Sequence, residues 1–289
     1  VLASMELGVI PRGAGTGLTG GAVPVDQDIV IINVEKLNVI QGFTNEKELG
    51  FSDRGDLKLV ELEAGVITGD AMDFASAQNL VFATDPTSSW ACTIGGNIAE
   101  NAGGKTAVLW GTAIDNLYSH KMVMPDGHAV EVRRLEHPCR KILPDDQVRF
   151  QVTDLDNNQS EIIEMRGDEV RKKGLWKDIT NKCLKKLPGV QKEGTDGIIT
   201  SARFVLHKAY QEKRTCCIEF FGDSFDEAGE AILEISNSFE NRGEEALFAL
   251  EHFDEEYVKA IQYKVKTAKR EIPKAVLLID IVGHSDEQV

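Results

Sequence analysis

The alternation of apolar and polar positions predicts that the first part of the chain is rich in strands. Short β-branched runs bounded by turn residues predict strands over residues 29–34, 57–64, 121–124 and 129–133. Apolar residues at helical spacing predict a helix over 68–79. A further strand is predicted over 197–206, and residues 174–187 are compatible with a helix.

The pattern changes at about residue 211, where strands and helices begin to alternate. Strand, helix, strand, helix and strand are predicted over residues 215–221, 224–239, 246–253, 255–265 and 276–282. This order predicts helices that cover one face of a small sheet. We therefore expect one domain over 1–210, with a polar surface insertion at about 137–168 that turns at 154–158, and the beginning of an α+β domain over 211–289.

A dense run of glycines and other small residues occupies positions 11–21, Pro-Arg-Gly-Ala-Gly-Thr-Gly-Leu-Thr-Gly-Gly. Glycines let successive backbone N–H groups converge on one point and let an anion approach the main chain closely. The run therefore predicts a phosphate-binding nest. A tight surface loop without a ligand is the structural alternative.

Residues 15–20 also match the G-x-G-x-x-G spacing of dinucleotide-binding Rossmann folds, with Glu35 about 20 residues further on. Such a site needs a full strand before the glycines and a helix that opens after them. Residues 21–26 have no helical periodicity and place Pro24 where the helix interior would lie. A Rossmann site is therefore disfavoured, and so is a Walker loop, because no Gly-Lys-Ser/Thr follows.

A second unusual stretch covers residues 84–104, where a cluster of hydroxyl side chains precedes two Gly-Gly steps at 95–96 and 103–104. Hydroxyl and amide donors suit a pyrophosphate or the carbonyl edge of a ring, and the small residues leave room for a flat ring beside the backbone. A small-residue packing segment between two layers is the alternative.

Together these stretches resemble the p-cresol methylhydroxylase-type FAD-binding domain of the vanillyl-alcohol oxidase superfamily. The branch of D-lactate dehydrogenases and glycolate oxidase catalytic subunits is most similar, because it pairs a PRGAGTGLTGG-like loop with a DPTSSWACTIGGNIAENAGG-like segment. Residues 193–200 resemble the branch's EGTLGIIT strand, with Asp196 in place of the usual apolar residue. The resemblance covers about residues 1–208. It implies an α+β fold, an FAD-binding domain of two α+β subdomains followed by the start of an α+β, ferredoxin-like cap domain.

The resemblance also implies which residues hold the cofactor. The first loop would wrap the FAD pyrophosphate and continue toward the flavin, the second stretch would line the pyrophosphate, ribityl chain and ring, and the third would contact FAD through its backbone. The expected FAD-binding residues are Arg12, Gly13, Ala14, Gly15, Thr16, Gly17, Leu18, Thr19, Gly20, Pro86, Thr87, Ser88, Gly95, Gly96, Asn97, Ala99, Asn101, Ala102, Gly103, Gly194, Gly197 and Ile199.

The net charge and hydropathy of the chain limit the classes of partner that we expect it to bind. Asp and Glu outnumber Lys and Arg by 47 to 32, which gives a formal charge of −15. Such a chain repels phosphate backbones and anionic lipids, which argues against nucleic-acid binding and membrane adhesion. Its longest apolar runs are far shorter than the roughly 18 residues of a transmembrane segment. With no signal-peptide pattern at its start, we expect a cytoplasmic protein, held at the inner face of a membrane only through a partner.

The pattern of cysteines and histidines does not predict a metal site. The five cysteines include no C-x-x-C pair and are read as reduced thiols. Cys92 is the one thiol placed for covalent flavin attachment, but the matching branch binds FAD without a bond, so we expect non-covalent FAD. None of the six histidines has ligand spacing. The branch's histidine-rich catalytic motif is absent, so the catalytic residues stay unassigned.

The resemblance implies an FAD-dependent dehydrogenase or oxidase that acts on the CH–OH group of a small 2-hydroxy acid such as D-lactate or glycolate, by hydride transfer to flavin N5. A quinone, a partner subunit or an iron–sulfur region outside this chain would accept the electrons. Since the chain lacks an initiator Met and stops in a predicted strand, we expect part of a longer protein whose N-terminal strands precede Val1. The alternatives are another FAD-linked oxidase such as an aldonolactone oxidase, and a flavin-bearing electron-transfer or regulatory module of a larger multidomain protein.

Overall fold

The structure is a computed structural model that describes residues 3–45, 47, 58–171, 183–222, 224–239, 246–268 and 271–289. The chain divides into two compact units, Val1–Ala209 and Tyr210–Val289. Each unit has its own sheet.

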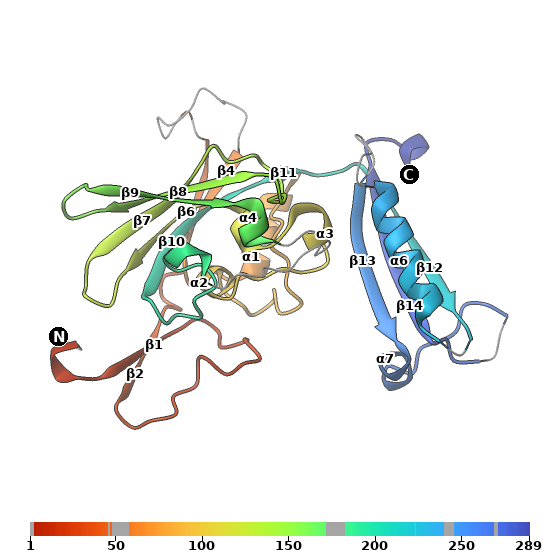
Figure 1. Ribbon diagram of the computed structural model, residues 1–289, viewed down its shortest axis with the longest axis horizontal. Helices are drawn as coiled ribbons and strands as arrows, with labels where there is room; N and C mark the ends of the chain where they lie inside the picture. The colour runs from red at the N-terminus through yellow and green to blue at the C-terminus, as the bar shows by residue number, and fades with distance from the viewer. Residues whose placement is uncertain are drawn as a thin grey trace. The chain divides into compact units, whose positions relative to one another are not determined.

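The first unit is built on a seven-stranded antiparallel sheet (Figure 1). Its strands are β3 Ile40–Asn45, β4 Lys58–Glu63, β6 Leu117–Val123, β7 Ala129–Leu135, β8 Gln147–Asp154, β9 Ser160–Arg166 and β10 Ile198–Val205. The strand order is β3-β4-β10-β6-β7-β8-β9. Strand β10 pairs antiparallel with both β4 and β6. The segment that leads into β10 is therefore brought to the interior of the sheet, between strands that lie far earlier in the chain.

Short helices cover this sheet: α1 Thr68–Ser76, α2 Ile94–Ala99, α3 Ala107–Trp110, α4 Ala113–Asn116 and α5 Gly167–Val170. Helix α1 is amphipathic and buries Ala71 and Ala75. Helix α2 packs on β4 and β10. Its apolar residues Ile94 and Ile98 are fully buried in the same core as Phe204 of β10. This core fixes α2, and with it the second glycine-containing stretch, to the middle of the sheet.

A separate parallel pair carries the first glycine loop. Strand β1 (Gly8–Arg12) pairs with β2 (Ile29–Asn33), and residues 13–28 join them without a helix. A strand therefore does precede the glycines, although none was predicted there. No helix follows them in this fully described stretch, so the Rossmann arrangement is absent. Another small pair joins β5 (Leu80–Val81) to β11 (His207–Lys208).

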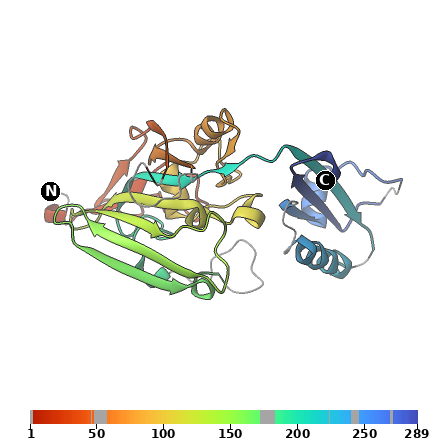
Figure 2. The same cartoon turned by 90° about the horizontal axis from the view of Figure 1, so that it is seen from above.

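Within residues 137–168, where a polar surface insertion was expected, residues 147–166 form two strands at the edge of the sheet. Strands β8 and β9 form a hairpin whose turn falls where the sequence predicted it, and they run beside β7 as one layer (Figure 2, yellow-green to green). The inward residues Val148 and Phe150 are buried in the main core. Their spacing of two residues is the ordinary sign of a half-buried strand, which the high polar content of the segment obscured.

The second unit contains a three-stranded sheet with the order β12-β14-β13. Its elements are β12 Glu212–Phe220, α6 Asp226–Phe239, β13 Ala246–Asp254, α7 Glu255–Ala260 and β14 Ala275–Gly283. Strand β14 lies between the other two and is antiparallel to both, which gives a split βαβ arrangement. Helix α6 lies along the sheet beside β13 (Figure 1).

The predicted α+β fold class is confirmed, and all predicted strands are present with shifted ends. The predicted helix over 255–265 ends earlier, at Ala260. The helix suggested over 174–187 falls mostly outside the described residues, which resume at Cys183 with a short 3-10 turn, Leu184–Lys186. None of the helices in the described ranges is both long and apolar enough to cross a bilayer.

Candidate cofactor-binding site

Three glycine-containing segments, far apart in the chain, meet at one cavity of the first unit, here named the glycine pocket. It has a volume of about 290 Å³. Residues of 11–22 supply one wall, residues of 86–102 a second and residues of 189–199 a third. The backbone N–H of Glu193 donates to Ala99 O at 2.9 Å, and that of Gln191 donates to Ile98 O at 3.1 Å. These bonds hold the third segment against the end of α2.

Glycine is required where the first two segments touch. A Cβ at Gly13 would lie 2.2 Å from the Thr93 hydroxyl oxygen, far inside van der Waals contact. Thr93 is itself held because it caps α2, accepting from the N–H of Gly96 at 3.4 Å. Gly15 has a φ of +70°, a left-handed conformation that favours glycine. Glycine at positions 13 and 15 therefore allows the loop to lie against α2 and to turn there.

Most donors of the first loop are left unused by the fold. Among the described residues, no hydrogen bond was found that uses the backbone N–H of residues 14–21 as donor. Arg12 lies at the start of this loop and donates to Ala22 O at 3.2 Å. A cationic side chain beside free N–H groups makes a site for an anion such as a pyrophosphate.

The remaining charged residues of the glycine pocket are acidic. Glu100, Glu193 and Asp196 line it together with Arg12. The Asp196 carboxylate accepts through Oδ2 from the N–H of Gly189 at 2.9 Å. Its Oδ1 atom is buried and has no hydrogen-bond partner within the described part of the protein. The pocket therefore has hydrogen-bond donors on its first wall and carboxylates on its second and third walls.

Most of the expected FAD-binding residues line the glycine pocket. Those that do are Arg12, Gly13, Ala14, Gly15, Thr16, Gly17, Leu18, Pro86, Ser88, Gly95, Gly96, Asn97, Ala99, Ala102, Gly194, Gly197 and Ile199. Those that the structure places outside the lining are Thr19, Gly20, Thr87, Asn101 and Gly103.

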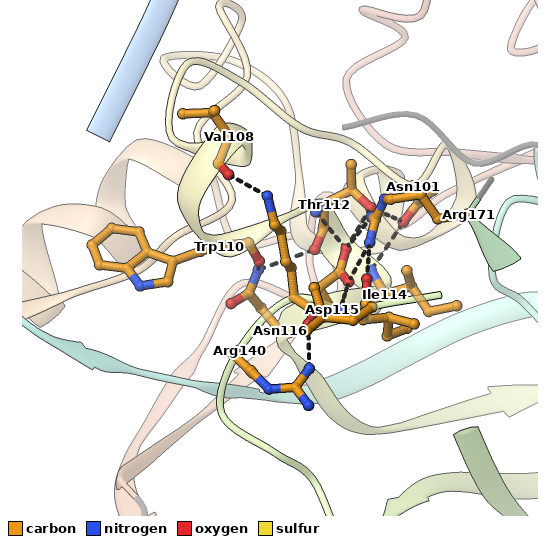
Figure 3. Close-up of polar contacts among 12 residues, drawn as sticks. Asn101, Val108, Trp110, Thr112, Ile114, Asp115, Asn116, Arg140 and Arg171 are labelled. Atoms are coloured by element: carbon orange, nitrogen blue, oxygen red, sulfur yellow. Dashed lines mark hydrogen bonds and ion pairs between the residues drawn. The ribbon is translucent and has the colours of Figure 1, made fainter. Parts of the chain in front are cut away.

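Asn101 lies outside the pocket lining and belongs to a buried network of polar contacts (Figure 3). Its side-chain oxygen accepts from the Thr112 hydroxyl at 3.1 Å and from the N–H of Ile114 at 2.9 Å. The same network includes Asp115, whose carboxylate is paired with the buried Arg171 guanidinium at 2.7 Å. Gly103 packs against Thr112 too, because a Cβ there would lie 2.9 Å from the threonine methyl group. Both residues therefore contact Thr112 and lie outside the lining.

Several lining residues were not selected from the sequence: Pro11, Gly21, Ala22, Val34, Cys92, Thr93, Glu100, Gly189, Glu193, Asp196 and Ile198. Thr93 and Glu100 lie inside the second motif and could have been included on that ground alone. Gly189 carried a weaker signal, a lone Pro-Gly step. Its φ of +76° lets it pass close to His120, whose Nε2 would lie 2.8 Å from an added Cβ.

Buried thiols and imidazoles near the site are held by the fold. Cys92 lines the pocket, is 5% exposed, and its Sγ lies 3.2 Å from the Thr68 hydroxyl. His120 contacts Pro188 O at 3.1 Å through Nε2, and burial lowers the pKa of its imidazole to about 4. Burial likewise lowers the pKa of His207 to about 4. In the described ranges, no group of three His, Cys, Asp or Glu could hold a metal ion.

Comparison with known proteins identifies the ligand class. Residues 1–133 match the model of an FAD binding domain. The chain is 35% identical over 127 residues to a D-lactate dehydrogenase of Anaerostipes hadrus, covering 44% of this chain and 24% of that protein. It is 32% identical over 126 residues to the glycolate oxidase subunit GlcD of Escherichia coli K12, covering 44% of this chain and 23% of that protein. The match thus spans about a quarter of the length of these relatives.

The fold has solved counterparts as well. Alkyldihydroxyacetonephosphate synthase superposes with a TM-score of 0.61 at 17% identity, covering 99% of this chain and 44% of that one. At this identity the likeness concerns the fold alone.

The residues of the glycine pocket fit part of an FAD molecule. The unused N–H groups and Arg12 suit its pyrophosphate. A cavity of about 290 Å³ lies at the lower end of the range for ligand sites. Residues 1–133 are therefore similar to an FAD binding domain, and FAD is the cofactor that this similarity supports.

Proposed function

We propose that the chain is the flavin-binding part of an FAD-dependent dehydrogenase that oxidises the CH–OH group of a small 2-hydroxy acid. The observation that carries the proposal is the convergence of the three motif segments on one pocket, together with the names of the relatives, a D-lactate dehydrogenase and a glycolate oxidase subunit. Both named substrates are 2-hydroxy acids.

In this proposal the first loop binds the pyrophosphate and the other two walls hold the adjoining parts of the cofactor. Arg12 and the N–H groups after it neutralise the negative charge. Bound FAD supplies a hydride acceptor at the flavin ring. The binding residues are those of the expected set that line the pocket, while Thr19, Gly20 and Thr87 act only where the cofactor extends beyond it.

The proposal assigns no catalytic base in the first unit. The buried imidazoles of His120 and His207 are committed to the fold, through Pro188 O and through a 2.8 Å contact with the Asn116 amide oxygen. The base, the contacts to the substrate carboxylate and the electron acceptor then belong to the second unit, to residues outside this chain or to a partner. A quinone, a partner subunit or an iron–sulfur centre are the acceptor classes that we propose.

A substrate screen tests the proposal. The complete protein, loaded with FAD, is mixed without oxygen with D-lactate, L-lactate, glycolate and D-gluconolactone, and the flavin absorbance near 450 nm is followed. We expect bleaching by one of the 2-hydroxy acids. Bleaching by the lactone alone would favour an aldonolactone oxidase. No bleaching by any alcohol, with reduction by a chemical reductant intact, would favour an electron-transfer or regulatory module.

A further inference from the structure

The third wall of the glycine pocket is formed by one loop, residues 188–197, named here the third-wall loop. It leads from the 3-10 turn Leu184–Lys186 into β10. Five of its residues line the pocket: Gly189, Glu193, Gly194, Asp196 and Gly197. The conformation of this loop therefore decides the shape of the third wall.

Both ends of the third-wall loop rest on strand β6. At the first end, His120 Nε2 contacts Pro188 O at 3.1 Å, and a Cβ added to Gly189 would lie 2.8 Å from the same nitrogen. At the second end, a Cβ added to Gly197 would lie 2.5 Å from Val123 O. Strand β6 lies inside the main sheet, between β10 and β7. The two ends of the loop therefore have fixed positions close to each other.

Between these ends the backbone has a conformation that is unfavourable without supporting contacts. Gln191 and Glu193 have φ values of +57° and +56°, in the left-handed region that is sterically poor for a residue with a Cβ. Gly189 and Gly194 are left-handed as well, each with a φ of +76°. A short loop with four such residues keeps its conformation only where surrounding bonds hold it.

Asp196 supplies the bond that joins the two ends of the loop. Its Oδ2 atom accepts from the N–H of Gly189, seven residues away, at 2.9 Å. A charged acceptor makes this bond stronger than one between neutral groups. The bonds from the N–H and hydroxyl of Thr195 to Lys192 O, at 3.0 and 2.6 Å, close only the tip of the loop. Within residues 188–197, all of which are described, the Asp196 bond therefore spans the neck.

We propose that Asp196 is a positioning residue for the cofactor: its carboxylate closes the neck of the third-wall loop and keeps the third wall in the conformation that binds FAD. This inference rests on FAD binding in the glycine pocket. Asp196 acts through Gly189 and needs no contact with the cofactor. Where the neck opens in part of the molecules, only the remaining fraction is competent, and the apparent FAD affinity falls in proportion to that fraction.

Two substitutions at this position separate the bond from the charge. Asp196→Asn removes the charge but keeps an oxygen that can accept from the N–H of Gly189. Asp196→Ala removes the charge and the acceptor together. Asp126→Ala is the matched control, since Asp126 is exposed, accepts a local bond from the N–H of His128 and lies outside the pocket lining.

FAD affinity is measured by titration of the full chain, well below the melting temperature of each variant, so that lost stability is not counted as lost binding. We expect Asp196→Ala to bind FAD about tenfold more weakly than the wild type. Asp196→Asn and Asp126→Ala should bind as the wild type does. Amide hydrogen exchange without FAD reports on the loop itself, and peptides that cover residues 188–197 should exchange faster in Asp196→Ala alone.

Two results would overturn the inference. Equal FAD affinity in the wild type, Asp196→Asn and Asp196→Ala would show that the bond to Gly189 does not matter for the cofactor. An equal loss in Asp196→Asn and Asp196→Ala would show that the charge acts, and not the bond. Should Asp196→Ala not fold, Asp196→Ser, which shortens the side chain by one bond, gives the same comparison. A wild-type chain that binds no FAD would instead refute FAD binding itself, so the two failures are distinguishable.

Discussion

The buried pair of Asp115 and Arg171 supports the second wall of the pocket, and replacing Asp115 by Asn should destabilise the first unit strongly. The two side chains are 0% and 3% exposed. The Asp115 carboxylate also accepts from the N–H of Ile142 at 2.6 Å and from the N–H of Thr112 at 2.7 Å. Asparagine keeps the shape but removes the charge and places its NH2 against one of these donors. Breaking such a pair by changing one partner costs about 3–5 kcal/mol.

Urea unfolding, monitored by tryptophan fluorescence, measures the loss of stability in the first unit specifically. The three tryptophans, Trp90, Trp110 and Trp176, all lie within Val1–Ala209. Glu136→Gln is the control, because its pair with Arg149 is exposed (78% and 36%) and should leave the unfolding midpoint unchanged. A midpoint for Asp115→Asn equal to that of the control would refute the reasoning. Because Thr112 also holds Asn101 of the second stretch, FAD affinity should fall in Asp115→Asn and not in Glu136→Gln.

Further predictions concern the first glycine loop, the buried imidazoles of His120 and His207, and the thiol of Cys92. Gly13→Ala should weaken FAD binding by at least about tenfold, because its Cβ would overlap the threonine at the α2 cap, whereas Gly229→Ala in α6, outside the pocket lining and with only an ordinary contact at 3.7 Å, should bind normally in the same titration. The folded pKa values of His120 and His207, about 4, lie below the ordinary value of 6.5. Their neutral forms thus stabilise the fold fully above pH 6.5 and lose this effect as pH falls toward 4. The burial of each histidine should therefore lower the free energy of unfolding by about 2 kcal/mol between pH 7 and 5. His120→Gln should reduce the slope of the unfolding free energy against pH, and an unchanged slope would contradict this. Cys92→Ser should keep its flavin in a form that acid releases, as in the wild type; flavin retained by the wild type but released from the variant would reveal a covalent bond.

The sequence predicted the elements that contain an apolar run or a simple apolar period. The strands β2 and β14 are short apolar runs, β13 alternates buried and less buried positions, and α1 and α6 have apolar residues at helical spacing, so these were found with small errors at their ends. Helix α2 was missed because two glycines, Gly95 and Gly96, follow its first residue and lower helix propensity. Its packing requires them, since a Cβ at Gly95 would lie 3.0 Å from that of Ala64. Tertiary contact thus overrides local preference at the site itself.

Residues of the site were predictable to the extent that a motif contains them. The glycine loop and the second stretch were recognised as wholes, so residues such as Gly13 and Gly96 were placed in the lining. A motif does not distinguish lining residues from other residues of the same stretch, and Asn101 shows this difference. Gly189 and Val34 enter the lining only because β10 and β2 bring their segments there. Such long-range placement has no local signal in the sequence.

The most direct test of the account is whether the chain binds FAD without a covalent bond. The purified chain is incubated with FAD, freed of excess cofactor, examined by visible spectroscopy and then precipitated with acid. We predict a flavin spectrum in the protein fraction and FAD in the acid supernatant. A colourless protein that takes up no added FAD would contradict the central claim.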